Sequence, residues 1–264
     1  MKIQLVPTKN LLSKSKIPGV DFVINPYVGC PHNCIYCYAD YMRKFTGHTE
    51  PWGSFVDIKQ PLTPLKPALL FHTHVMLCST TDPYNPLEEQ YQLTRRILEQ
   101  LVQAQAYVSI LTKSDLVVRD IDLLKQLERC EVGFSFSSVD KSVCQQLEPG
   151  AASPDKRLAA LKTVSQAGLF TVVMAAPLIP GISDWKSIIT ATQEYTNEYR
   201  FDKLNLKPGF QKKVISFIAA NYPHLVPLYS DIYLKGNLRY WQELAQQINP
   251  FCQQQKISST IFFD

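Results

Sequence analysis

The chain has 264 residues, of which 45% are hydrophobic and 19% are charged, and its formal net charge at pH 7 is +4. A chain of this length can bury a full apolar core, so it needs no disulfide staple. No apolar run reaches the roughly 18–20 residues that span a bilayer, which excludes a transmembrane helix. Residues 1–19 lack the long apolar run and the cleavage site of a signal peptide, so we expect a cytoplasmic protein.

Six short segments rich in β-branched residues predict strands. Most of them are apolar at consecutive positions, which is typical of strands buried on both faces of a parallel sheet. The segments are 20–28, 74–80, 106–112, 131–138, 170–177 and 201–208.

Helical patterns lie between the predicted strands. In 86–105, larger side chains recur every three or four positions along one helix face. Ser153 is the expected N-cap of a helix over 154–168 that begins with proline and closes with glycine. Asp184 is the expected cap of a further helix that runs to about Glu198.

Six strand-then-helix units predict an α/β fold. Their short connections favour a partial (β/α)6 TIM-like barrel over a doubly wound open sheet. We expect a single domain over 1–264, with an N-terminal extension (1–19), a barrel core (20–210) and a C-terminal extension (211–264). The last part of that extension predicts an amphipathic helix and a final strand or extended segment that closes the barrel mouth.

Polar residues follow the second to sixth predicted strands. In barrel folds such residues at the carboxyl ends of the strands line the active site, so we expect a polar rim there. They are Ser79, Thr80, Thr81, Asp82, Lys113, Ser114, Ser135, Ser137, the segment 177–181, Asn205 and Lys207.

Three of the seven cysteines crowd together after the first predicted strand, in the sequence GCPHNCIYCYA (29–39). The flanking glycine and proline indicate an irregular loop, which can wrap Cys30, Cys34 and Cys37 around one ion or cluster. Three thiolates suit a [4Fe–4S] cluster, which normally takes four cysteine ligands. One iron then has no ligand from the loop.

Zinc is an alternative, with His32 or His48 completing a Cys3His site in a non-catalytic binding module. His32 lies between two of the ligands and is poorly placed to reach the same metal, whereas His48 can reach it. Three structural thiols without metal are a third alternative, although a polar loop is a poor place to bury cysteine.

The motif Cys30-x3-Cys34-x-Tyr36-Cys37 resembles the signature of the radical S-adenosylmethionine (radical SAM) superfamily. Over about residues 20–210 the chain also resembles the spore photoproduct lyase-related, SplB-like branch. The segments that carry this resemblance are NPYVGCPHNCIYCYA, STTDPYNP (79–86), LTKSDLVVRDIDLL (111–124), EPGAASPDKRLAAL (148–161) and APLIPGISD (176–184).

This resemblance implies an enzyme with one [4Fe–4S] cluster and S-adenosylmethionine as cofactors. In the superfamily, the open iron binds the amino and carboxylate groups of S-adenosylmethionine. An electron from a reductant such as flavodoxin or ferredoxin then releases methionine and a 5′-deoxyadenosyl radical, which abstracts hydrogen from the substrate. The reaction that follows, a lyase reaction or another, is open.

The resemblance also implies residue roles. Tyr36 is expected to pack near the adenine, with plain core packing as the alternative. Ser79, Thr80 and Thr81 occupy the place of the family's Gly-Gly-Glu segment, with a simple helix cap as the alternative. Because this chain has no glutamate there, Thr80, Thr81 or Asp82 is expected to accept from the methionine ammonium.

Further cofactor contacts are implied on later segments. Lys113 and Ser137 match positions near the ribose or carboxylate, and Arg157 is a candidate partner of that carboxylate. Both Lys113 and Arg157 have solvent exposure as their alternative. The adenine floor and edge are expected from Ile179, Leu204, Asn205 and Leu206.

Cys78 bears on the substrate. Spore photoproduct lyases are expected to use a cysteine near this strand end as hydrogen donor, which is the catalytic role Cys78 would have. Counted back from Asp82, however, Cys78 lies one residue out of that register. One residue reverses the face of a strand, so a buried structural thiol is the alternative.

Between Arg200 and Arg239 the chain has a local charge surplus of +5, which predicts either a solvated face or a surface for nucleic acid or another polyanion. DNA repair of the photoproduct type is therefore the alternative function, while a peptide or small-molecule substrate stays open. Cys252 stands alone, so we expect no auxiliary cluster, and we expect a monomer without a membrane partner. The seven basic residues of the stretch are Arg200, Lys203, Lys207, Lys212, Lys213, Lys235 and Arg239.

Overall fold

The computed structural model describes residues 1–206 and 210–263; Lys207 therefore lies outside the described residues. The strands are β1 (Lys2–Thr8), β2 (Leu12–Lys14), β3 (Phe22–Ile24), β4 (Tyr27–Val28), β5 (Phe55–Pro61), β6 (His74–Leu77), β7 (Tyr107–Thr112), β8 (Arg129–Ser135), β9 (Phe170–Leu178), β10 (Glu198–Lys203) and β11 (Ser259–Phe262).

The α-helices are α1 (Pro67–Leu70), α2 (Glu88–Tyr91), α3 (Leu93–Gln103), α4 (Ile121–Leu124), α5 (Lys141–Leu147), α6 (Pro154–Gln166), α7 (Trp185–Thr192), α8 (Gln211–Asn221), α9 (Val226–Tyr229) and α10 (Arg239–Gln254). Short 3-10 segments are η1 (Tyr38–Phe45), η2 (Leu116–Asp120), η3 (Gln193–Tyr195) and η4 (Pro223–Leu225), and η5 (Ser230–Leu234) is a π-helical turn.

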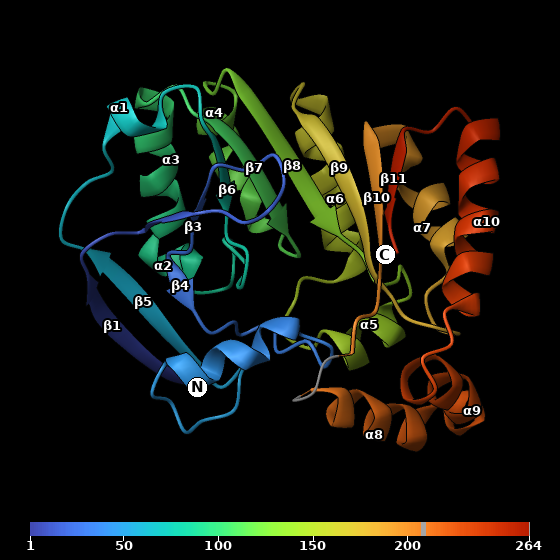
Figure 1. Ribbon diagram of the computed structural model, residues 1–264. Helices are drawn as coiled ribbons and strands as arrows, with labels where there is room; N and C mark the ends of the chain where they lie inside the picture. The colour runs from blue at the N-terminus through green and yellow to red at the C-terminus, as the bar shows by residue number, and fades with distance from the viewer. Residues whose placement is uncertain (207–209, 264) are drawn as a thin grey trace.

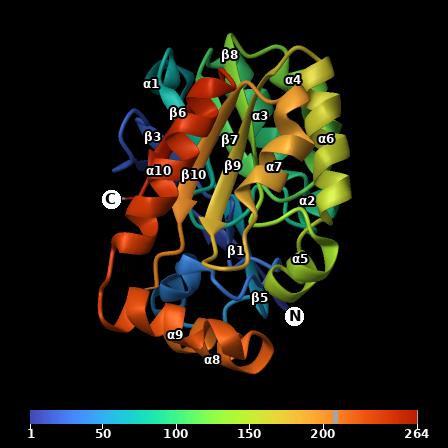
Figure 2. The same cartoon turned by 90° about the vertical axis from the view of Figure 1, so that its right-hand side faces the viewer.

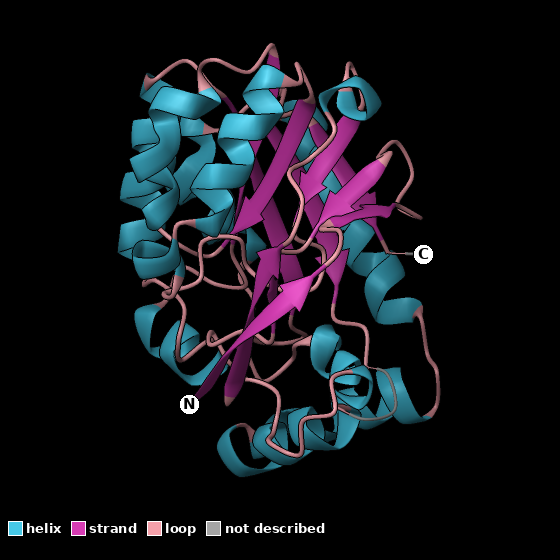
Figure 3. Ribbon diagram, turned by 90° about the vertical axis from the view of Figure 1, so that its left-hand side faces the viewer, coloured by secondary structure: helices cyan, strands magenta, loops and turns pink. Residues whose placement is uncertain are grey.

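Two sheets build the molecule (Figure 1). The larger has the strand order β11-β10-β9-β8-β7-β6-β3-β2, and all its neighbouring pairs are parallel except β2 with β3. Strands β3 and β6 to β10 are the six strands of a partial (β/α)6 TIM-like barrel, as predicted. The smaller sheet, β1-β5-β4, lies in front of the larger one in Figure 3.

Helices cover the outer face of the barrel sheet, and Figure 2 shows α10 along β10, α7 beside β9 and α6 next to α7. The strand residues beneath them are fully buried, as Val132, Val173 and Phe201 illustrate with 0% exposure. The helices cover the outer face of each strand and the barrel interior covers the inner face. Both faces are therefore buried, and this explains why the strand segments are apolar at consecutive positions. Within residues 1–206 and 210–263, no helix is long and apolar enough to cross a membrane.

The helix caps follow the sequence closely. Ser153 caps α6 by accepting from the backbone N–H of Lys156, and Asp184 caps α7 in the same way, both as predicted. The helix predicted after Asp184 ends earlier than expected, because 193–195 tighten into η3 and β10 begins at Glu198.

The single helix predicted over 86–105 is wrong. The chain breaks at Gln92, whose φ of 49° is left-handed, and α3 starts afresh at Leu93. The buried carboxylate of Glu88 accepts from the N–H groups of Thr94 and Arg95, at 2.9 and 3.3 Å, and so caps the new helix. The cap that Glu88 supplies from α2 offsets the free-energy cost of breaking the helix at Gln92.

Several predicted strand boundaries also differ. The segment 20–28 is two strands in different sheets, because Pro26 has no N–H to continue a ladder. The final strand β11 does not cross the barrel mouth; it pairs in parallel with β10 at the sheet edge. The last predicted barrel strand is displaced toward the N-terminus, to Glu198–Lys203.

Candidate functional site

The three clustered cysteines lie on an irregular loop between β4 and η1, as the sequence predicts. The loop lies at the carboxyl ends of the barrel strands, the end toward which the arrows of β8 and β9 point in Figure 1. Two backbone hydrogen bonds fix it to the end of α5 and the turn that follows: the Ile35 N–H donates to Leu147 O, and the Gly150 N–H donates to His32 O, both at 3.0 Å. The loop is therefore held by the barrel as well as by its own turns.

Glycine is required at two points of close approach. Gly29 has φ of +87°, and a Cβ there would lie 2.2 Å from the carbonyl oxygen of Phe55. A Cβ on Gly150 would lie 2.1 Å from the carbonyl oxygen of Pro31. Both distances are far inside van der Waals contact, so neither position accepts a side chain without moving the loop.

Cys30 is buried, Cys34 and Cys37 are half-buried, and the three thiols lie close enough to affect one another. Burial raises the pKa of Cys30 to about 12, with the Cys37 thiol adding to the effect. Burial also raises the pKa of Cys34 and Cys37, while the ammonium of Lys113 favours both thiolates. The indole N–H of Trp52 likewise favours the thiolate of Cys37. Three cysteines close together in one loop, which bound iron would deprotonate, are a donor set that fits an iron–sulfur cluster.

His48, one of the two candidate fourth ligands of the zinc alternative, has other partners in the structure. Both ring nitrogens of His48 are used, by Asp57 at 2.9 Å and Glu50 at 3.2 Å, and the ring stacks on Phe55. In the described part of the chain, no group of three or more His, Cys, Asp or Glu side chains is arranged to hold one metal ion. A tetrahedral zinc site needs all its ligands around a single point, whereas a cubane spreads its ligands over separate irons.

A buried carboxylate, Glu148, organises the base of the site. It accepts hydrogen bonds from the hydroxyls of Tyr36 and Ser137, the latter at 2.7 Å, and forms a 2.6 Å salt bridge with Arg157. Burial works to raise the pKa of Glu148, but Arg157 and Lys113 outweigh it and hold that pKa below its usual value. Glu148 is therefore a buried anion that joins the cysteine loop to β8 and α6.

Arg157 does not face solvent, and each of its three guanidinium nitrogens donates a hydrogen bond within the protein. Besides the bond to Glu148, it donates to the carbonyl oxygens of Ser135 at 2.7 Å and Ala152 at 2.9 Å. Lys113, in contrast, makes no salt bridge among the described residues, and its ammonium lies 5.8 Å from the centre of the Tyr36 ring. A half-buried cation beside Cys34 is thus left for an anionic group.

The segment after β6 joins the cysteine loop to the neighbouring strand. Asp82 accepts from the Thr112 hydroxyl and the Lys113 N–H, both at 2.7 Å, so its carboxylate is already occupied. The Thr81 hydroxyl donates to Gly29 O at 2.9 Å. The Thr80 hydroxyl donates weakly to Asn25, at 3.4 Å.

Ser79 belongs to the same junction, because its N–H donates to the Asn25 side chain at 2.9 Å and its carbonyl accepts from the hydroxyl of Tyr38. Cys78, just before it, is buried and has a left-handed φ of 62°. The simple alternation of strand faces therefore ends at Leu77 and does not apply to Cys78. Its thiol lies near Asp82 and Cys30, at the same end of the barrel as the cysteine loop.

The predicted adenine-binding segments meet at the ends of β9 and β10. The N–H of Leu204 donates to Leu178 O at 3.1 Å, and the N–H of Ile179 donates to Ser183 Oγ at 2.8 Å. Ile179 and Leu204 are buried, Leu206 is half-buried and Asn205 is exposed. The Ser183 hydroxyl in turn donates to Ser137 O at 2.6 Å, which joins this segment to β8.

The basic residues predicted to form a charge surplus between Arg200 and Arg239 are partly paired with acidic side chains. Arg200 pairs with Glu131 and Glu198, and Arg239 pairs with Glu243. Lys203 donates to a backbone carbonyl near the end of the chain, and Lys235 lies 3.6 Å from Asp231. This pattern favours the solvated-face interpretation over a continuous polyanion surface.

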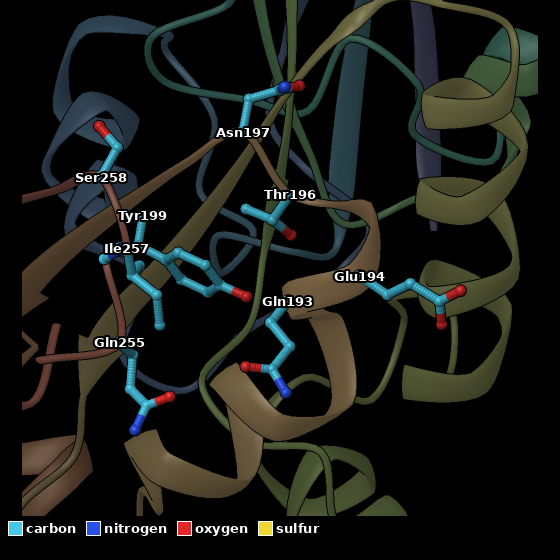
Figure 4. A pocket seen from close by; sticks show the side chains of 9 residues that line it. Gln193, Glu194, Thr196, Asn197, Tyr199, Gln255, Ile257 and Ser258 are labelled. Atoms are coloured by element: carbon cyan, nitrogen blue, oxygen red, sulfur yellow. The ribbon is translucent and has the colours of Figure 1, made fainter.

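The cavity in Figure 4, about 470 Å³ in volume, lies at the opposite end of the barrel. Asn197 and Tyr199 line it from the start of β10, and Gln255 and Ser258 from the turn before β11. In barrel folds the amino ends of the strands serve stability and the carboxyl ends carry the chemistry. The cysteine loop, and not this cavity, therefore marks the candidate active site.

Two residues of the site are missed by sequence reasoning. Glu148 opens one of the segments that resemble the SplB-like branch, but nothing in its neighbours shows that it would meet Tyr36. Trp52 packs with Cys30 and Phe55 from the turn before β5. Neither residue carries a local motif, because their partners come from distant parts of the chain.

Comparisons with known proteins identify the family of the chain. The model of the radical SAM superfamily matches residues 24–190. An uncharacterized protein of Methanocaldococcus jannaschii is 37% identical over 235 residues, which cover 88% of each chain.

Two solved structures share the fold. Spore photoproduct lyase complexed with dinucleoside spore photoproduct has a TM-score of 0.61 at 17% identity, covering 84% of this chain and 66% of that one. Streptococcus suis SuiB bound to S-adenosylmethionine has a TM-score of 0.59 at 14% identity, covering 91% of this chain and 49% of that one. The chain spans about two thirds of the first of these proteins and about half of the second. With the family model matching well over half its length, the chain belongs to the radical SAM superfamily, whose enzymes use a [4Fe–4S] cluster, S-adenosylmethionine and a reductant.

Proposed function

We propose that Cys30, Cys34 and Cys37 hold one [4Fe–4S] cluster and that the chain cleaves S-adenosylmethionine to begin a hydrogen-abstraction reaction. The observation that carries the proposal is the loop of three closely spaced cysteines, held by backbone hydrogen bonds at the carboxyl ends of the barrel strands. When bound, the cluster and S-adenosylmethionine supply a 5′-deoxyadenosyl radical after reduction by a protein such as flavodoxin or ferredoxin.

The chain's own residues bind and orient the cofactor in this proposal. Lys113 pairs with the carboxylate of S-adenosylmethionine, because its ammonium has no salt-bridge partner among the described residues, whereas Arg157 is committed to Glu148. Tyr36 is held by Glu148 so that its ring offers a fixed face to the adenine.

The amino group of the cofactor needs an acceptor near the end of β6. Asp82 is occupied by its bonds to the segment after β7, so the hydroxyl oxygens of Thr80 and Thr81 are the better acceptors. The segments at Ile179 and Leu204 supply the adenine floor.

Anaerobic reconstitution with iron and sulfide, followed by dithionite and S-adenosylmethionine, tests this proposal. We expect about four irons per chain and formation of 5′-deoxyadenosine, both lost in Cys34→Ala. Cys252→Ala is the control, because it also removes a single free cysteine but from α10, away from the loop. Cleavage retained without Cys34, or zinc in place of iron, would refute the ligand assignment.

A nucleic-acid substrate is the second candidate, favoured by the surface of η1. Directly after Cys37, the exposed rings of Tyr38, Tyr41 and Phe45 lie on one short segment, with exposures of 54%, 48% and 68%. Lys44 lies over the Phe45 ring at 4.9 Å. Exposed rings interleaved with cations stack bases and attract phosphates.

Fluorescence anisotropy with a labelled single-stranded oligonucleotide tests this second candidate. We expect binding that weakens with salt and that falls at least fivefold in a Tyr41→Ala/Phe45→Ala variant, an estimate of about 1–3 kcal/mol for each stacked base. Phe71→Ala, which removes an equally exposed ring from another surface, is the control. Equal binding by all three proteins, or none at low salt, would remove nucleic acid from consideration.

A further inference from the structure

The indole of Trp52 is buried beside the cysteine loop with its N–H unsatisfied. The side chain is 5% exposed and belongs to a small apolar group with Cys30, Ala39 and Phe55, against which Cys37 also packs. Its Nε1 atom is fully buried and has no hydrogen-bond partner among the described residues. A buried donor without an acceptor is costly and rare in folded proteins.

Two packing contacts define the position of the indole. Trp52 meets the Phe55 ring edge to face, with the ring centres 5.7 Å apart. The next residue, Gly53, has φ of +95°, and a Cβ there would lie 2.4 Å from the side chain of Asn33 in the cysteine loop. The turn that carries Trp52 therefore lies directly against the loop, and the indole packs on Phe55 beside it.

Sulfur is the acceptor that this pocket provides. The apolar group around Trp52 contains the side chains of Ala39, Phe55, Val28 and Met42 and two of the three clustered cysteines. A neutral thiol is a weak acceptor, whereas a thiolate bound to iron is a good one.

We propose that the Trp52 N–H donates a hydrogen bond to the Cys37 thiolate sulfur of the bound cluster and raises the reduction potential of that cluster. This rests on the proposed function, because it requires the cluster on Cys30, Cys34 and Cys37. Reduction adds negative charge to the cluster, so a hydrogen bond to its sulfur stabilises the reduced form more than the oxidised form. Trp52 is therefore a positioning residue that helps to set the reduction potential at which the cluster accepts an electron.

Redox titration of the reconstituted protein, monitored by electron paramagnetic resonance, tests the proposal with Trp52→Phe. Phenylalanine keeps an aromatic ring but has no N–H. We expect the ratio of reduced to oxidised cluster at a fixed potential to fall about threefold to tenfold, a shift of up to about 59 mV to more negative potential for one electron. Trp241→Phe is the matched control, because Trp241 is equally buried but packs against Phe263.

A potential unchanged in Trp52→Phe, with full iron content, would overturn the proposal and leave the proposed function intact. A wild-type protein that assembles no cluster would instead refute the proposed function. If Trp52→Phe does not load iron, the proposal is tested instead on wild-type protein whose indole nitrogens are labelled with 15N. We expect a 15N hyperfine coupling to the reduced cluster, and its absence would overturn the proposal.

Discussion

Replacing Glu148 with glutamine removes one charge from the base of the site and keeps the shape of the side chain. Glu148 and Arg157 are 2% and 0% exposed, so Glu148→Gln leaves the guanidinium buried without its anion. Removing one partner of a buried pair costs about 3–5 kcal/mol. The hydroxyls of Tyr36 and Ser137 also lose a charged acceptor, which makes this a lower bound. In a chain of this size, Tm should fall by roughly 2–4 °C for each kcal/mol.

The effect of Glu148→Gln on the free energy of unfolding should also depend on pH. The pKa of Glu148 is lowered in the folded protein, so its charge stabilises the fold above the unfolded pKa of about 4.3 and that stability is lost as pH falls. The difference in unfolding free energy between wild type and Glu148→Gln should therefore be constant from about pH 7 to pH 5 and should shrink below about pH 4.

Urea denaturation at a series of pH values measures both effects. Glu243→Gln is the control, because the Arg239–Glu243 pair has the same kind of contact, at 2.7 Å, but is exposed to solvent. We expect that control to change stability little, since exposed pairs are screened. If Glu148→Gln and Glu243→Gln unfold at the same urea concentration, Glu148 is not the buried anion described above.

Further substitutions test the loop and its neighbours. Gly29→Ala places a Cβ against the Phe55 carbonyl and should reduce the iron content after reconstitution severalfold, whereas Gly47→Ala, at a similar φ but in open space, should not; equal iron contents would contradict the packing argument. Cys78→Ala should retain full 5′-deoxyadenosine formation, because Cys78 is not a ligand in the proposed site; a loss of cleavage would show otherwise, and a change in the substrate product alone would support a hydrogen-donor role. His48→Gln should retain the iron content by elemental analysis, and a loss of bound metal would revive the zinc alternative.

The cysteine loop and the barrel could be predicted because their signals are local. The spacing of the cysteines lies within eight positions, and runs such as 106–112 carry their burial pattern in consecutive residues. The strand β1 could not be recognised, because Ile3 and Leu5 are 42% and 53% exposed and the strand is held mainly by its backbone ladder with β5.

The predictions that were wrong, for the helix over 86–105 and for the solvent exposure of Arg157, have a different physical cause. The helix break at Gln92 depends on a carboxylate that turns toward the next helix, which no propensity encodes. Arg157 looks like an ordinary helix residue in the sequence, yet its partner Glu148 lies in the preceding turn and points inward. Charge in a sequence does not reveal which side chains tertiary packing will bury.

The anchoring of the cysteine loop has a consequence for the order in which the protein matures. The loop is made early in synthesis, but its backbone supports at Leu147 and Gly150 are made much later. When the loop leaves the ribosome, Leu147 and Gly150 have not yet been synthesised. The loop and its three thiols therefore lack these two backbone hydrogen bonds at that stage. Under the proposed function, a cluster that binds the loop in the conformation described here does so after the chain through Gly150 has been made and folded.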